Sequence, residues 1–192
     1  MKLTYDLEGI GWATVYLKIN DKEEYFNPSY FSEALIDLLD SVMILMPEFT
    51  PNDEIKETSS FEWEQEPAIA IWTLKKLGKE QLEISIRLYK DGTKKLNERD
   101  LGETLIEEQC NRNDLINEIV DSLDQLVKKY GLVGYRENWY RGDFPIGRYL
   151  KLKNYVLSGQ TINYELINEG EHNEYRKTSL RTEMNILTEL LK

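Results

Sequence analysis

This chain of 192 residues has one cysteine, one histidine and no apolar run longer than five residues. A single cysteine, Cys110, allows no internal disulfide, which suits a reducing compartment. Runs such as VMILM at 42–46 fall far short of the ~20 apolar residues that a membrane-spanning helix needs. The first residues also lack the apolar core of a signal peptide. We therefore expect a cytoplasmic protein with no membrane partner.

The scarcity of histidine and cysteine also limits the chemistry. Neither a CxxC nor a His-x-x-x-His spacing exists, so we expect no metal site and no cofactor. His172 lies in the polar stretch NEGEHNEY, which is typical of a solvated loop. Cys110 has acidic neighbours on one side, which would oppose thiolate formation. Gly9 and Gly11 predict a turn, because the third glycine of a nucleotide-binding loop is missing and a strand follows. We therefore expect a protein that is not an enzyme.

Positively charged residues are fewer than negatively charged ones. The chain has 24 Lys and Arg against 35 Asp and Glu, a net charge of −11. This excess argues against nucleic acid or an anionic membrane as a partner and favours a basic protein. Acidity is also a common means of staying soluble, so the charge alone does not establish a binding function.

The strongest periodic pattern lies in residues 27–46, NPSYFSEALIDLLDSVMILM. Apolar residues recur there at steps of three and four, which predicts a helix with one broad apolar stripe. The stripe consists of Phe31, Ala34, Leu35, Leu38, Leu39, Val42, Leu45 and Met46. Asn27 is expected to cap the helix and Pro47 to end it. A stripe this broad predicts packing against a sheet, centred on Leu38.

Segments with a two-residue period supply that sheet. They predict strands at about 3–7, 12–19, 23–26, 61–66, 68–77 and 82–89. The last of these has the clearest alternation, whereas residues 96–111 give no firm assignment. A second helix is predicted from Asn113 or Asp114 to Gly131. The expected fold class is α+β, with one antiparallel sheet of about five or six strands and helices packed on one of its faces.

Residues 132–192 are expected to be an α-rich extension packed on a core of residues 1–131, together forming one globular unit. The extension begins with aromatic and basic residues, among them Tyr135, Arg136, Trp139 and Arg141. Such a mixture can bind single-stranded nucleic acid, but the net charge opposes this interpretation. We expect the aromatic residues to cover the sheet and the arginines to contact acidic segments of the same chain.

The most acidic segment runs from Glu48 to Glu66, with seven acids against Lys56 alone. We predict a partner-binding surface from the following members of this segment: Asp53, Glu54, Glu57, Glu62, Trp63, Glu64 and Glu66. Trp63 would serve as an anchor if it faces outward. A merely solvated strand face is the simpler interpretation. A further alternative is a hydrolase, in which two of these carboxylates would act across a cleft.

A strand, a helix and a strand follow one another at Gly11–Asn20, SYFSEALIDLL (29–39) and FEWEQEPAIAIWTL (61–74). Over residues 9–90 this pattern resembles small acidic bacterial proteins that are uncharacterised or assigned as immunity proteins to secreted polymorphic toxins. The resemblance implies a non-enzymatic cytoplasmic protein that binds and neutralises a basic toxin domain. A structural or regulatory protein that forms a homodimer through a sheet edge is the alternative.

Overall fold

The computed structural model describes residues 1–94, 101–140, 142–168 and 174–191. The chain divides into two compact units, residues 1–145 and 146–192. The second unit consists of helix α3 (Ile146–Ser158), the hairpin of β8 (Glu165–Asn168) and β9 (Glu174–Lys177), helix α4 (Leu180–Thr188) and a short 3-10 helix (Glu189–Leu191). It is α-rich and begins at residue 146, whereas the sequence placed the start of the extension at residue 132. The first unit contains the candidate site.

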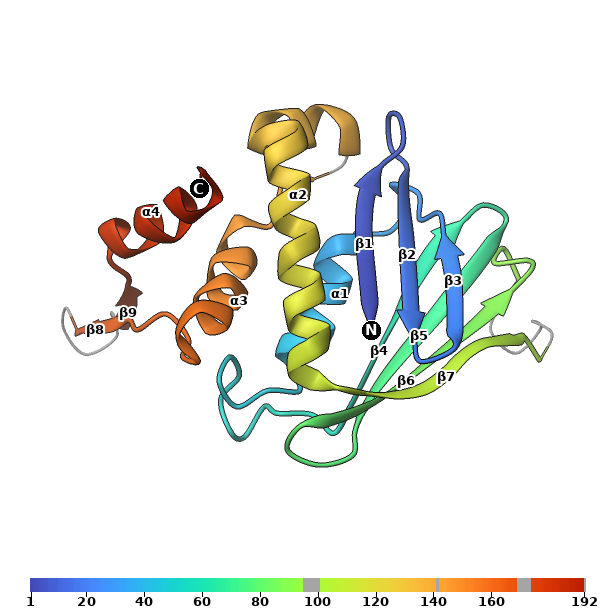
Figure 1. Cartoon of the computed structure of the whole chain (residues 1–192), viewed down its shortest axis with the longest axis horizontal. Helices are drawn as coiled ribbons and strands as arrows, with labels where there is room; N and C mark the ends of the chain where they lie inside the picture. The colour runs from blue at the N-terminus through green and yellow to red at the C-terminus, as the bar shows by residue number, and fades with distance from the viewer. Residues whose placement is uncertain (95–100, 141, 169–173, 192) are drawn as a thin grey trace. The chain divides into compact units, whose positions relative to one another are not determined.

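Two antiparallel sheets form most of the first unit (Figure 1). The three-stranded sheet has the order β1 (Lys2–Leu7), β2 (Ala13–Ile19), β3 (Lys22–Phe26). The four-stranded sheet has the order β4 (Thr58–Gln65), β5 (Ala68–Lys76), β6 (Gln81–Tyr89), β7 (Glu103–Asn111). The α+β class is therefore confirmed, but the prediction of one sheet with five or six strands is wrong. Alternation shows which residues share a face of a strand, and it does not show which strands pair.

The buried faces of both sheets follow the predicted alternation. Leu3, Tyr5 and Leu7 are buried on β1, and every second residue of β2 is buried beside them. Phe26 of β3 packs with three aromatic rings of the four-stranded sheet, with centroids between 4.5 and 6.2 Å apart; these rings are Phe61, Trp63 and Trp72. Rings at these distances in tilted geometry add to the stability gained from area burial.

Helix α1 (Ala34–Met43) begins later than predicted, at Ala34 rather than Asn27. Its stripe is buried as expected from Ala34 onward, and Leu38 is 1% exposed, but Phe31 is 52% exposed. The helix ends at Met43, before the predicted end at Pro47. The residues before the helix are held by other parts of the chain. Ser29 forms an isolated bridge with Trp12, and the Tyr30 N–H donates to the Gly11 carbonyl at 2.8 Å. Because these backbone groups bond to distant segments, they are not used in a first helical turn, and Asn27 is not the cap.

Helix α2 (Arg112–Trp139) begins close to its predicted start. The Asn111 side chain caps it by accepting hydrogen bonds from the backbone N–H groups of Asn113 and Asp114. At Gly131 the backbone leaves helical geometry, with φ 69° and ψ 173°, and helical turns then resume to Trp139. The sequence thus predicted the interruption of the helix at Gly131. The helical turns after it come from residues 132–139, which the sequence assigned to the extension.

The outer edge of β1 is closed by side chains of α2. Ser122 Oγ accepts the Tyr5 N–H at 2.6 Å, and Glu118 Oε2 accepts the Leu3 N–H at 3.2 Å. An outer strand with satisfied N–H groups does not add a further strand readily. This edge of the smaller sheet is therefore protected against association with another chain.

Candidate protein-binding surface

The predicted acidic surface is spread along β4 rather than gathered in one patch. Asp53, Glu54 and Glu57 precede the strand, and Glu66 follows it. Nine residue steps separate Glu57 from Glu66, about 30 Å at ~3.3 Å per residue. This exceeds the screening length of about 8 Å at physiological salt. The carboxylates at the two ends therefore act on a partner independently.

The beginning of the segment is partly neutralised inside the molecule. Glu57 Oε1 lies 3.2 Å from Lys76 Nζ, and Glu48 Oε1 lies 3.5 Å from Arg112 Nη2. A surface ion pair such as the first contributes only about 0–1 kcal/mol to stability, but each of the two pairs reduces the negative potential around it. The beginning of the segment is therefore less negative than its number of carboxylates indicates.

Trp63 does not lie on that surface. Its side chain is 0% exposed, and its Nε1–H donates to the Ala34 carbonyl at 3.0 Å. Successive side chains of a strand point to opposite faces, so Trp63 faces the core while Glu62 and Glu64 face the other way. The condition for an anchor, an outward Trp63, is not met. This residue instead fixes the start of α1 to β4.

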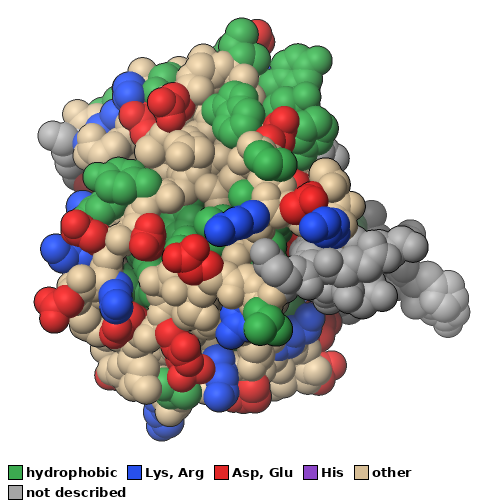
Figure 2. All heavy atoms as spheres, turned by 90° about the vertical axis from the view of Figure 1, so that its right-hand side faces the viewer, with side chains coloured by type: hydrophobic (Ala, Val, Ile, Leu, Met, Phe, Trp, Pro, Cys, Tyr) green, Lys and Arg blue, Asp and Glu red, His purple; other side chains and the backbone are tan. Residues whose placement is uncertain are grey.

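The β1–β2 loop lies at the top of Figure 1, and backbone hydrogen bonds join it to the segments that carry the exposed side chains of Phe31 and Tyr140. We name this region the loop end, and it comprises residues 9–12, 29–33, 64–67, 92–93 and 138–140. Ile10 is 71% exposed, Phe31 52% and Tyr140 65%. Figure 2 shows hydrophobic side chains gathered at the top of the molecule, with acidic side chains among them. Sequence reasoning missed this surface because it placed Phe31 on the apolar stripe of a helix.

Backbone hydrogen bonds join the segments of the loop end. The four N–H to carbonyl pairs are Gly11 to Asn138 (2.7 Å), Tyr30 to Gly11 (2.8 Å), Ser29 to Glu64 (2.7 Å) and Gly92 to Pro67 (2.7 Å). Each bond connects parts of the chain that are far apart in the sequence. The exposed side chains are thus held on a connected framework.

Tyr30 is the central ring of this framework. It stacks on Phe31 with centroids 4.6 Å apart and meets Tyr140 edge to face at 5.4 Å. Gly11 allows this arrangement, because a Cβ there would lie 2.7 Å from Tyr30 Cδ1. Gly11 also has φ +79°, a conformation that favours glycine. The Gly9–Gly11 segment, predicted to be a turn, therefore has a second role in positioning aromatic rings.

A hollow of about 690 Å³ opens beside Phe31. Its other lining residues come from the end of β4 and from two turns: Glu64, Glu66, Pro67, Gly92 and Thr93. Glu66 is exposed, and Glu64 is half-buried. The hollow therefore brings one aromatic ring together with two of the predicted acidic residues.

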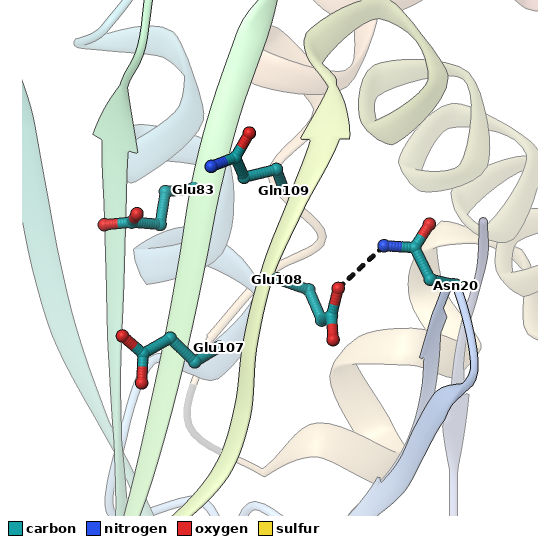
Figure 3. Close-up of a pocket in the computed structure, with 5 residues that line it drawn as sticks. All are labelled: Asn20, Glu83, Glu107, Glu108 and Gln109. Carbon is teal, nitrogen blue, oxygen red and sulfur yellow. Dashed lines mark hydrogen bonds between the residues drawn. The ribbon is translucent and has the colours of Figure 1, made fainter.

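A second hollow, of about 480 Å³, also contains carboxylates. It is lined by Asn20, Glu83, Glu107, Glu108 and Gln109. Figure 3 shows Glu108 turned toward Asn20, whose Nδ2 donates to it at 2.7 Å, while Glu83 and Glu107 point away. Glu107 and Glu108 are consecutive in β7 and therefore face opposite sides of the sheet. The carboxylates of this hollow therefore lie on both faces of the sheet, and none of them belongs to the acidic segment 48–66.

Cys110 and His172 are the two other side chains considered from the sequence. Burial and, to a smaller extent, the charge of Asp114 raise the pKa of the Cys110 thiol to about 11. Burial is thus a larger cause than the acidic neighbours considered from the sequence. His172 lies outside the described residues.

Within the described residues, no group of three or more His, Cys, Asp or Glu side chains could hold a metal ion. Nor does the described part of the chain contain a helix long and apolar enough to span a membrane.

Comparisons with known proteins do not assign the chain to a family. No family model matches the chain, and no curated protein matches it. Among solved structures, a chain of the CdiA-CT/CdiI toxin and immunity complex from Enterobacter cloacae is similar, with a TM-score of 0.39 and 14% sequence identity. The match covers 64% of this chain and 99% of that chain. A likeness this distant carries no argument about function, which must come from this chain's own residues.

Proposed function

We propose that this protein is a non-enzymatic binding module for a basic protein partner, which it contacts through the carboxylates at the end of β4 and the neighbouring loop end. The observation that carries the proposal is the juxtaposition of exposed aromatic rings with Glu64 and Glu66 around one hollow. The sequence resemblance to immunity proteins implies a toxin domain as the partner. In this role the protein neutralises the toxin domain by binding to it.

The physical case has two parts. Carboxylates on a chain of net charge −11 speed encounter with a cationic surface and set the orientation of the complex. Exposed aromatic side chains such as Phe31 and Tyr140 supply the buried contact area from which most binding energy comes. Enzymes that act on nucleic acid have cationic sites, so an acidic protein of this kind can occupy one as a mimic of the substrate.

Self-association through a sheet edge is the competing function. β4 is an outer strand of the larger sheet, and an outer strand can pair with a second copy. However, pairing two β4 strands would bring the acidic residues of both copies together, and like charges on neighbouring strands are destabilising. A basic partner removes this repulsion, so we place self-association second.

Affinity capture from the native organism tests the proposal, followed by purification of the captured protein and measurement of Kd at two salt concentrations. The test variant changes Glu62, Glu64 and Glu66 to Lys together. The matched control reverses three exposed acids outside the segment: Asp21, Glu103 and Asp121. We expect a basic partner whose affinity falls by at least about tenfold, or about 1.4 kcal/mol, in the test variant and changes little in the control.

Two results would contradict the proposal. One is a partner whose affinity and salt dependence are the same for the test variant and the wild type. The other is capture of no partner by a protein that sediments as a dimer, which would favour self-association. Circular dichroism of each variant must match the wild type before the binding data are compared.

A further inference from the structure

We infer that the hollow at the loop end receives an arginine side chain of the basic partner, an inference that rests on the proposed function. It names the residue type that the partner inserts and the position where it is bound. The groups that would contact it are the Phe31 ring and the carboxylates of Glu66 and Glu64, all of which line the hollow.

The hollow is large enough to admit a long side chain. Its volume of about 690 Å³ lies within the range of ~300–1,000 Å³ that is usual for binding pockets. Pockets for small molecules are lined mainly by apolar groups, whereas here, within the described part of the chain, two of the six lining residues are apolar, Phe31 and Pro67. The hollow therefore suits a polar side chain carried by a larger molecule, with the rest of that molecule resting on exposed residues such as Tyr140.

The chemistry of the lining selects arginine. A guanidinium group can lie flat against an aromatic ring and at the same time donate hydrogen bonds in its plane to carboxylates. The ammonium group of lysine is a compact and strongly hydrated charge that does not stack in this way. An apolar side chain would contact Phe31 but would remove water from Glu66 without replacing its hydrogen bonds.

The framework around the hollow makes binding favourable. Phe31 is stacked on Tyr30, and the turn that carries Glu66 and Pro67 is fixed by the Gly92 N–H bond to the Pro67 carbonyl. Groups that are already ordered lose little conformational entropy when a partner binds. The hollow therefore differs from the acids before β4, which lie in a loop without exposed aromatic residues nearby in the sequence.

A library of random peptides displayed on phage provides a test that can be run before the partner is identified. Selection on the wild-type protein is followed by Kd measurements for synthetic copies of the enriched peptides. The test variants are Phe31→Leu, which removes the ring and keeps an apolar side chain, and Glu66→Gln, which removes the charge alone. The matched controls are Tyr25→Leu, an exposed aromatic residue on β3, and Glu54→Gln, an exposed acid before β4.

We expect enrichment of peptides that contain arginine. Their affinity should fall about fivefold or more in Phe31→Leu and in Glu66→Gln, and less than about twofold in either control. Changing the arginine of the peptide to lysine should also weaken binding about fivefold or more.

Two outcomes would overturn the inference. In the first, peptides with arginine bind but lose affinity in Glu54→Gln and not in Phe31→Leu or Glu66→Gln. In the second, the enriched peptides lack arginine. Neither outcome decides the proposed function, which depends on the captured partner and the triple reversal variant.

Discussion

The close approach of Gly11 to Tyr30 can be tested with a pair of substitutions in one loop. Gly9 and Gly11 have nearly the same backbone conformation, with φ +78° and +79°. A Cβ at Gly9 would meet nothing within 4 Å, whereas a Cβ at Gly11 would lie 2.7 Å from Tyr30 Cδ1. Gly9→Ala is therefore a control for backbone strain, and Gly11→Ala adds displacement of the ring.

The expected magnitudes follow from these geometries. Alanine with positive φ costs about 1–2 kcal/mol, and the loss of unfolded-state freedom offsets about 0.4–1 kcal/mol of that. Gly9→Ala should therefore lower the free energy of unfolding by roughly 0.5–1.5 kcal/mol. Gly11→Ala should lower it by a further ~1–3 kcal/mol, the usual cost of overpacking, because Tyr30 is held on both sides by Phe31 and Tyr140.

Urea unfolding followed by tryptophan fluorescence measures the free energy of unfolding of the unit formed by residues 1–145. All four tryptophans, Trp12, Trp63, Trp72 and Trp139, lie in residues 1–145, so the signal does not report the second unit. If the two variants differ by less than about 0.5 kcal/mol, the scatter expected of ordinary surface substitutions, then Tyr30 is not held against Gly11 as described. The proposed role of Gly11 in positioning the aromatic rings would then be refuted.

Three further predictions concern the core and the single thiol. Leu38→Ala should lower the free energy of unfolding by about 2–5 kcal/mol in the same assay, and a cost below ~1 kcal/mol would contradict the burial of Leu38. Ser122→Ala should cost about 1–3 kcal/mol, because it leaves the buried Tyr5 N–H without its acceptor; an equal cost for Ser85→Ala on the half-buried face of β6 would count against this reason. With its pKa raised to about 11, Cys110 is only about 0.1% thiolate at pH 8, against about 24% for an ordinary thiol. A thiolate of higher pKa is also a stronger nucleophile, which offsets part of this difference. Its reaction with a disulfide reagent should therefore be about tenfold or more slower in native than in urea-unfolded protein, and equal rates would show that the thiol is not protected.

The sequence by itself determined the local elements and their buried faces. Leu38 and its neighbours form the buried stripe of α1, and the alternation in residues 82–89 marks the inner face of β6. These patterns are readable because a helix repeats every 3.6 residues and a strand every two. β7 was missed because, of its nine residues, only Ile106 and Cys110 are buried, so its apolar alternation is weak.

Only the tertiary structure decided which of these elements meet, and the candidate surface depends on that. The acids of residues 53–66 read as one cluster in the sequence, but β4 extends them over about 30 Å. Phe31 reads as a residue of the helical stripe, but bonds from Ser29 and Tyr30 to Glu64 and Gly11 draw its segment out of the helix. Those bonds join residues that are far apart in the chain, and a periodic pattern carries information only about near neighbours. That Phe31 and the end of β4 line one hollow was therefore beyond what the sequence could show.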